Sequence, residues 1–195
     1  VVNMGATSIH SAQEIGRLKS EIKLNSDDVI IFYNGVNDVL QRIIYENHEG
    51  YMIGEPKQES FWIKQLRSKS KYSSILYVFY SKIIENTKET PSTLIKTSID
   101  HYVNTLVLVN EYVKAQGASF YHFLQPTLFT KKNLNKYEKI LIEKGYPFVP
   151  TQFIQDFKRA YPLISNKLDS VEFSYSLVGA FNNLKKSPYL DFCHV

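Results

Sequence analysis

The 195-residue sequence contains a single cysteine, which excludes an internal disulfide and a metal site built from several cysteines. No stretch approaches the ~18–20 consecutive apolar residues that a membrane-spanning helix needs. The first five residues have neither the basic leader nor the long apolar region of a secretory signal, and they are typical of a buried strand already under way. These absences leave a globular domain whose compartment the sequence does not assign; a membrane anchor would have to precede residue 1.

What the sequence does contain is ordinary in most respects. Hydrophobic residues make up 44% and charged residues 22%, and the net charge is +4. The aromatic share of 14% is high, and such residues fill a core or line a groove for sugars or acyl chains. The length predicts one domain over 1–195, with an insertion at about 45–91 that has the polar and Gly/Pro-rich character of a loop.

The densest basic stretch, 64–71, lies beside Trp62 and Tyr72. A basic stretch with neighbouring aromatic residues can bind nucleic acid or an anionic surface. A solvated helix face is the interpretation that we favour, since no nucleic-acid-binding signature accompanies it. We therefore expect no nucleic-acid partner.

Hydrophobic periodicity predicts strands alternating with helices along the whole chain. Apolar residues three and four positions apart between 92 and 116 indicate a long amphipathic helix, which Gly117 ends. Ser8 or Ser11 is expected to cap the first helix. The alternation predicts an α/β layered fold with a mainly parallel sheet. The expected strands are 1–3, 28–33, 118–124 and 171–174, and the expected helices are 11–24, 37–45, 92–116, 133–144 and 152–163.

Three polar or small residues fall just after predicted strands: Gly5, Asn37 and Gln125. In parallel sheets, ligands sit at the carboxyl ends of the strands. Near the end of the sequence, Asp191 and His194 place a carboxylate and an imidazole three positions apart. A histidine with its orienting aspartate, together with a hydrogen-bond donor at a strand end, supplies two of the three parts of a serine-esterase site.

Each of these residues also has a simpler interpretation. An isolated histidine near a chain end is usually a surface residue, and Asn37-Asp38 alone could be a turn and a helix cap. Gln125 and the proline after it could only end a strand. The other histidines are dispersed without metal-ligand spacing, so we expect structural or surface roles for them and no metal. Cys193 is expected to pack inward.

Three islands of sequence, taken in order, resemble the second, third and fifth sequence blocks of the SGNH, or GDSL-type, hydrolases. They are Asn3-Met4-Gly5, then Tyr33-Asn34-Gly35-Val36-Asn37-Asp38, then Asp191-Phe192-Cys193-His194. Phe123-Leu124-Gln125-Pro126 resembles a segment of a carbohydrate-associated bacterial branch of that family. The resemblance implies a three-layer α/β/α, flavodoxin-like fold.

The resemblance also implies a reaction, the transfer of an acyl group from an ester to water. His194 would be the general base and Asp191 would orient it, while the backbone N–H of Gly5 and the amide of Asn37 would form the oxyanion hole. The implied substrate is a small ester or an O-acylated, often O-acetylated, carbohydrate, with no metal or cofactor. Gln125 and Trp62 are the candidate substrate contacts.

The sequence departs from the family pattern at both ends. The family carries its nucleophilic serine on a first strand upstream of the block at Gly5, and a helix follows its catalytic histidine. Neither is present, and Ser8 and Ser11 are poor substitutes, so we expect the sequence to be an incomplete view of the hydrolase. Two alternatives stay open: an inactive module of the same fold that binds a glycan or a protein, and a lipase or lysophospholipase.

Overall fold

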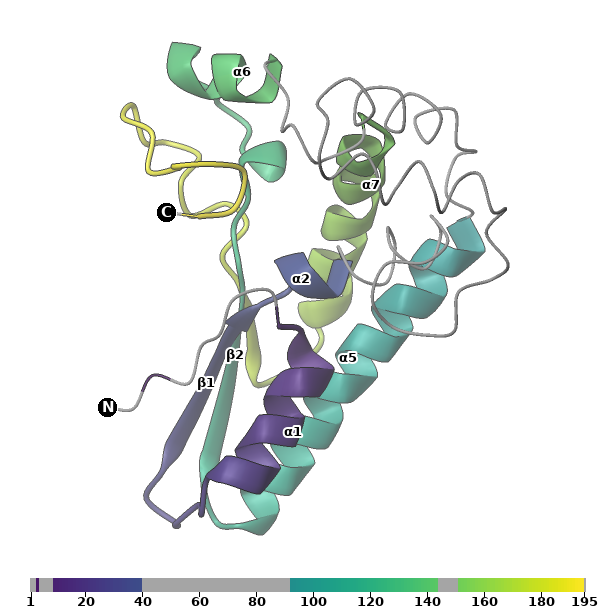
Figure 1. Ribbon diagram of the computed structural model, residues 1–195, viewed down its shortest axis with the longest axis vertical. Helices are drawn as coiled ribbons and strands as arrows, with labels where there is room; N and C mark the ends of the chain where they lie inside the picture. The colour runs from purple at the N-terminus through teal and green to yellow at the C-terminus, as the bar shows by residue number, and fades with distance from the viewer. Residues whose placement is uncertain (1–2, 4–8, 40–91, 144–150, 195) are drawn as a thin grey trace, which may run out of the picture.

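The computed structural model describes residues 3, 9–39, 92–143 and 151–194. Several predicted features lie outside these residues: most of the first strand, the insertion at about 45–91, the basic stretch 64–71, and Trp62. The described part is a mixed α/β fold in which helices alternate with the strands of a parallel sheet (Figure 1). The prediction of an α/β class with a parallel sheet is therefore confirmed.

Over the described residues the sheet has three parallel strands in the order β1-β2-β3: β1 (Val29–Asn34), β2 (Ser119–Leu124) and β3 (Ser174–Ser176). Val29 of β1 aligns with Ser119 of β2, and His122 of β2 aligns with Ser174 of β3. The fourth predicted strand, 171–174, has the wrong bounds. The N–H of Ser174 donates to the carbonyl of Val171, so the preceding residues form a turn and β3 begins at Ser174.

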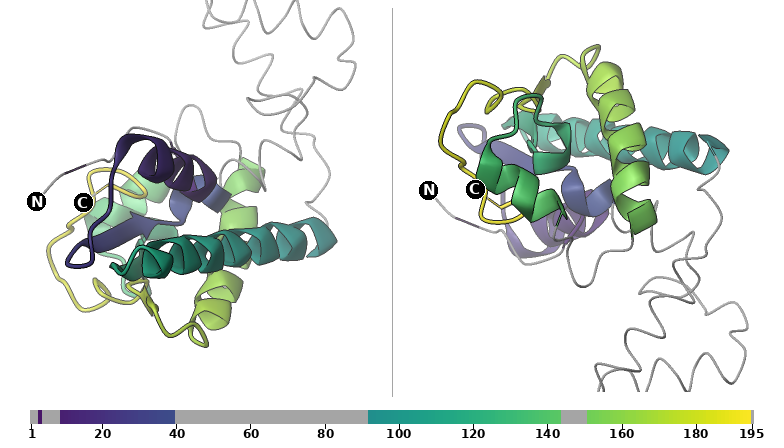
Figure 2. Two further views of the ribbon diagram at one scale, coloured as in Figure 1. Left: turned by 90° about the horizontal axis from the view of Figure 1, so that it is seen from below. Right: turned by 90° about the horizontal axis from the view of Figure 1, so that it is seen from above.

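Helices α1 (Ser11–Glu21) and α5 (Ser92–Ala115) lie side by side against one face of the sheet (Figure 2). The buried side of α5 carries the predicted repeat of apolar residues, and Gly117, with φ of +80°, follows its end. Helix α2 (Val36–Val39) follows the end of β1 and contacts α7 (Thr151–Leu168). The buried apolar side chains of these helices and of the sheet form one core.

Three helix boundaries differ from the prediction. The first helix ends at Glu21 rather than Leu24, and its N-cap residue is His10 rather than Ser8 or Ser11. The helix predicted at 133–144 begins later, as α6 (Lys136–Glu143), because Asn135 caps it. The helix predicted at 152–163 continues to Leu168 through Pro162, because its last turns pack into the core.

The opposite face of the sheet is exposed in the described part of the chain. Ile31 is 60% exposed, and three tyrosines on the same face, one from each strand, are 40–46% exposed: Tyr33, Tyr121 and Tyr175. Helices α1 and α5 cover the other face of the sheet, and among the described residues no helix covers this one. The three-layer arrangement implied by the family resemblance stays a prediction.

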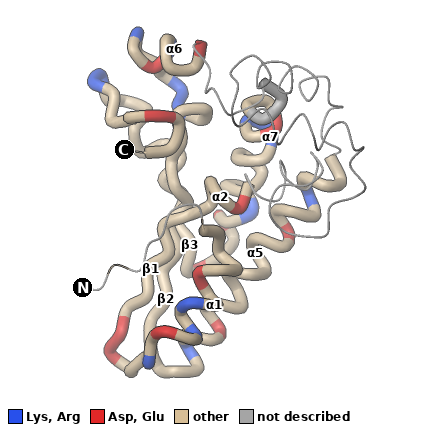
Figure 3. Tube along the Cα trace, viewed as in Figure 1, with Lys and Arg blue, Asp and Glu red and all other residues tan. Residues whose placement is uncertain are grey.

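Two further properties agree with the sequence. Basic and acidic residues are interspersed over the described chain trace instead of gathering in one block (Figure 3). Among the described helices, none combines the length and the apolar character that crossing a membrane requires.

Candidate active site

The turn after β1 depends on glycine. Gly35 has φ of +116°, a conformation that residues with a side chain rarely adopt. A Cβ placed there would lie 2.5 Å from Cδ1 of Leu124 and 3.2 Å from the hydroxyl of Tyr102. The turn therefore packs against its surroundings so closely that only glycine fits, and helix α2, which carries Asn37 and Asp38, begins directly after it.

Both of these polar residues tie α2 to the start of α1. The amide Nδ2 of Asn37 donates to the carbonyl of Ile9 at 2.8 Å. The carboxylate of Asp38 accepts from the backbone N–H of Ser11 at 3.1 Å and from its hydroxyl at 2.5 Å. Asp38 thus braces α2 against the first turn of α1. Ser11 is 1% exposed, so its hydroxyl is occupied in the interior and does not serve as a surface nucleophile.

A chain of buried hydrogen bonds runs beneath this turn. Asn34 Nδ2 donates to Glu14, and Asn34 Oδ1 accepts from the hydroxyl of Tyr102 at 2.8 Å. Tyr102 also contacts Nε2 of His122 at 2.8 Å, and Nδ1 of that histidine lies 2.7 Å from Oγ of Ser174. The network joins α1, β1, α5, β2 and β3, and it satisfies polar groups that would be costly to bury alone.

Burial shifts the pKa of two groups in the network, His122 and Glu14. It lowers the pKa of His122 to about 3, so the imidazole is neutral and structural. The pKa of Glu14 is raised to about 7, first by burial and then by the charge of Asp38, against the lowering effect of the bond from Asn34. A carboxyl group that ionises near neutral pH therefore lies next to the turn.

The structure brings Asp191 and His194 into direct contact. Nδ1 of His194 lies 2.5 Å from Oδ2 of Asp191, while Oδ1 of that carboxylate accepts the backbone N–H groups of Cys193 and His194, both at 2.8 Å. Burial raises the pKa of Asp191, but the bonds from His194 and the two backbone groups outweigh it, and the net pKa is lowered. The His194 side chain is 70% exposed, so its Nε2 is open to solvent.

The loop that carries this pair, 182–194, consists of turns and bends and is held by the segment after β2. Nε2 of Gln125 donates to the carbonyl of Cys193 at 2.7 Å, and the N–H of Leu128 donates to Phe192 at 2.8 Å. The rings of Phe129 and Phe192 stack with centroids 5.3 Å apart. Gln125, predicted as a substrate contact, is thus shown to hold the loop; its contact with substrate stays a prediction.

Cys193 has the packing that was expected for it. Its side chain is buried, and burial together with the Asp191 carboxylate raises the pKa of the thiol to about 12. The thiol, Asp191 and His194 place three donor atoms within 4.8 Å of one another, a spacing that could hold a metal ion. In this environment the uncharged thiol is the favoured form of Cys193.

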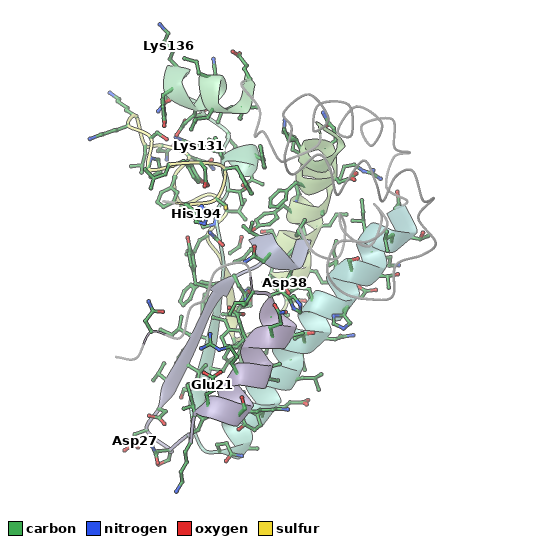
Figure 4. All side chains as sticks on the ribbon, viewed as in Figure 1. Glu21, Asp27, Asp38, Lys131, Lys136 and His194 are labelled. Atoms are coloured by element: carbon green, nitrogen blue, oxygen red, sulfur yellow. The ribbon has the colours of Figure 1, made fainter. Side chains whose placement is uncertain are left out.

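The two halves of the candidate site lie beyond the same end of the sheet. Both strands β1 and β2 run towards α2 and the C-terminal loop, and His194 and Asp38 lie beyond their carboxyl ends (Figure 4). Tyr33 lies near the end of β1. Burial raises the pKa of its hydroxyl, and the neighbouring Cys193 raises that pKa further. Of the other predicted site residues, Gly5 and Trp62 lie outside the described residues, as does Ser8.

Several residues of the site region were not found from the sequence. They include the network under the turn and a buried pair, Lys131 and Glu138, beside the loop. The sequence does carry one signal for the second of these. Asn135 and Glu138 have the N-cap and N3 spacing of a capping box, and their reciprocal bonds begin α6.

No protein-family model, no curated protein and no solved structure matches the chain.

Proposed function

We propose that this chain carries the acid–base and oxyanion parts of an ester-hydrolase site of the SGNH type. The observation that carries the proposal is the contact between Asp191 and His194. The carboxylate engages Nδ1 and leaves Nε2 of an exposed imidazole towards solvent. A histidine that acts as general base on a serine needs this orientation, with the aspartate bound at Nδ1 and Nε2 available to take the serine proton.

The reaction would proceed through an acyl-serine intermediate. His194 Nε2 takes the proton of the serine hydroxyl as its oxygen attacks the ester carbonyl, and the proton then passes to the departing alcohol. Water attacks the acyl-serine in the second half, with His194 again as base. Asp191 keeps the imidazole in the correct tautomer and stabilises its protonated form.

Asn37 is the described candidate for the oxyanion hole. A side-chain amide has two N–H donors, and one of them goes to Ile9. The second would point at the developing oxyanion, together with the backbone N–H of Gly5. Loss of one such donor costs roughly 3–4 kcal/mol of transition-state stabilisation.

The proposal requires a serine from outside the described residues, and its strand would pair with the edge of β1 that no described strand occupies. Asp28 and Asn34 direct their carbonyls at β2, so the N–H and C=O groups of Val29, Ile31 and Tyr33 face the other edge. A groove of about 800 Å³, lined by β1 and α1, runs along that edge. A parallel strand there would end beside the Gly35 turn. A helix following it could cover the exposed sheet face and complete three layers.

Esterase kinetics on the full-length natural protein would test this function. We expect hydrolysis of 4-nitrophenyl acetate and release of acetate from O-acetylated carbohydrate, with kcat falling by about 10³-fold or more in His194→Ala. His101→Ala is the matched control, because His101 is an exposed histidine on α5. Faster turnover of long-chain esters than of acetyl esters would instead indicate the lipase alternative. Binding of glycan or protein without turnover would indicate the non-catalytic module.

A further inference from the structure

The segment beside the candidate site contains an ion pair that is almost completely removed from water. Nζ of Lys131 lies 2.7 and 2.9 Å from the two carboxylate oxygens of Glu138, and the side chains are 1% and 0% exposed. Lys131 follows the 3-10 turn η2 (Leu128–Thr130), and Glu138 lies in α6. Taking two charges out of water is expensive, and an apolar pair of similar shape is often at least as stable. The presence of the pair therefore calls for a reason besides stability.

The remaining hydrogen bonds of the pair connect it to the loop 182–194. Nζ of Lys131 also donates to the carbonyl of Leu184 at 3.3 Å, and Ser187 donates to the Glu138 carboxylate. The backbone N–H of Asn135 donates to Glu138 at 2.8 Å. Burial raises the pKa of Glu138, but the bonds from Lys131, Asn135 and Ser187 outweigh it and the net pKa is lowered. The Glu138 carboxyl is thus ionised at neutral pH.

The loop needs such an anchor because it has no helix or strand of its own. The pair holds its first half, and two neighbouring bonds assist. The N–H of Lys132 donates to the side chain of Asn182 at 2.8 Å, and the amide of Asn135 donates to the carbonyl of Lys185 at 3.2 Å. The second half closes on itself where the N–H of Leu190 donates to the carbonyl of His194 at 2.9 Å. Lys131 and His194 lie in the same part of the molecule, above the strand ends (Figure 4).

From this arrangement we propose that Lys131 and Glu138 are positioning residues for the Asp191–His194 pair. The ion pair fixes the first half of the loop through the carbonyl of Leu184, and the loop in turn fixes where the imidazole of His194 stands. Neither side chain reaches solvent, so neither touches substrate. The inference rests on the proposed ester hydrolysis for its kinetic consequences, and on the loop geometry alone for its structural consequences.

The first test is Glu138→Gln in the full-length protein, with Lys132→Met as the matched control because Lys132 is exposed and uses only its backbone N–H here. One carboxylate oxygen of Glu138 becomes an NH2 group in glutamine. That group faces a hydrogen-bond donor and cannot accept from it, so one bond is lost and the loop is held less tightly. We expect kcat for 4-nitrophenyl acetate to fall by about tenfold or more, with KM changed less than about twofold. The amides of Leu190 and His194 should exchange hydrogen about tenfold faster, while those of β2 keep their protection.

A second variant separates positioning from stability. In the double variant Lys131→Met, Glu138→Leu, an apolar pair restores packing and the thermal unfolding temperature, but no donor remains for Leu184. We expect kcat to stay low and exchange at Leu190 to stay fast. Recovery of both to the original values would overturn the proposal. So would a fall in kcat that only follows the fraction of folded protein.

The two proposals can fail independently. If the full-length protein hydrolyses no ester, the proposed function fails, while hydrogen exchange at Leu190 and His194 still tests the positioning. If the protein is an active esterase and both Glu138→Gln and the double variant keep its kcat and its exchange rates, only the positioning role is overturned.

Discussion

The turn at Gly35–Asp38 and the loop at 182–194 lie at the same end of the sheet but are built in opposite ways. The turn is buried, and its side chains bind their neighbours in the core. The loop is irregular and presents its histidine to solvent, and side chains from another segment fix its backbone. From this contrast we expect the buried side chains of the turn to act mainly on folding and the loop to act mainly on the proposed hydrolysis, while Asn37 of the turn stays the proposed oxyanion donor. Substitutions in the two regions should therefore separate into effects on stability and effects on turnover.

The largest effect should come from the loop and should be kinetic. Asp191→Asn keeps an oxygen for the two backbone N–H groups but no longer stabilises the imidazolium or its tautomer. We expect kcat to fall about 10⁴-fold with little change in the free energy of unfolding. Asp169→Asn is the control, since Asp169 is an exposed residue after α7. A fall of less than about tenfold would remove Asp191 from the mechanism.

Gly35→Ala should be the most damaging change in the turn. Its φ of +116° is strained for alanine, and the new Cβ would lie 2.5 Å from Leu124. We expect the free energy of unfolding, measured with urea, to drop by about 4 kcal/mol. Gly16→Ala, at a helical position with nothing within 4 Å, should instead add about 0.5–1 kcal/mol. Equal effects at the two glycines would contradict the account of the turn.

Glu14→Gln should stabilise the protein in a pH-dependent way. Because folding raises the pKa of Glu14 from 4.5 to about 7, the folded state binds more protons than the unfolded state in that window, and stability falls as pH rises through it. Glutamine removes this loss. We expect a gain of roughly 2–3 kcal/mol at pH 8 and none at pH 4. Urea unfolding at both pH values measures it, and a gain that is the same at both would show that ionisation is not the cause.

Gln125→Ala should have the smallest effect of these substitutions. It is expected to act on both stability and turnover, because Gln125 follows β2 and binds the backbone of the loop. It removes the 2.7 Å bond to the carbonyl of Cys193, which is worth about 1 kcal/mol. We expect kcat to fall several-fold as the loop shifts, and the fall should be smaller than in Asp191→Asn. A rise in KM with unchanged kcat would show that Gln125 binds substrate and does not position the loop.

The comparison also explains how far sequence reasoning could reach. Alternating strands and helices, the apolar repeat of α5 and the glycine after β1 follow local rules of period and backbone geometry, so the sheet and the turn were predictable. The spacing of Asp191 and His194 allowed their contact to be predicted as well. The network from Glu14 to Ser174 was not predictable, because residues up to 88 positions apart in sequence meet there only after folding. The capping-box spacing of Asn135 and Glu138 predicts a helix start but gives no sign of the partner at Lys131.

The central claim is that Asp191 and His194 activate a serine. Labelling the full-length natural protein with a fluorophosphonate, followed by peptide mass spectrometry, tests it most directly. The account predicts a label on one serine outside the described residues, and loss of that label in His194→Ala but not in His101→Ala. A folded protein that takes no label, or takes it equally without His194, would contradict the account.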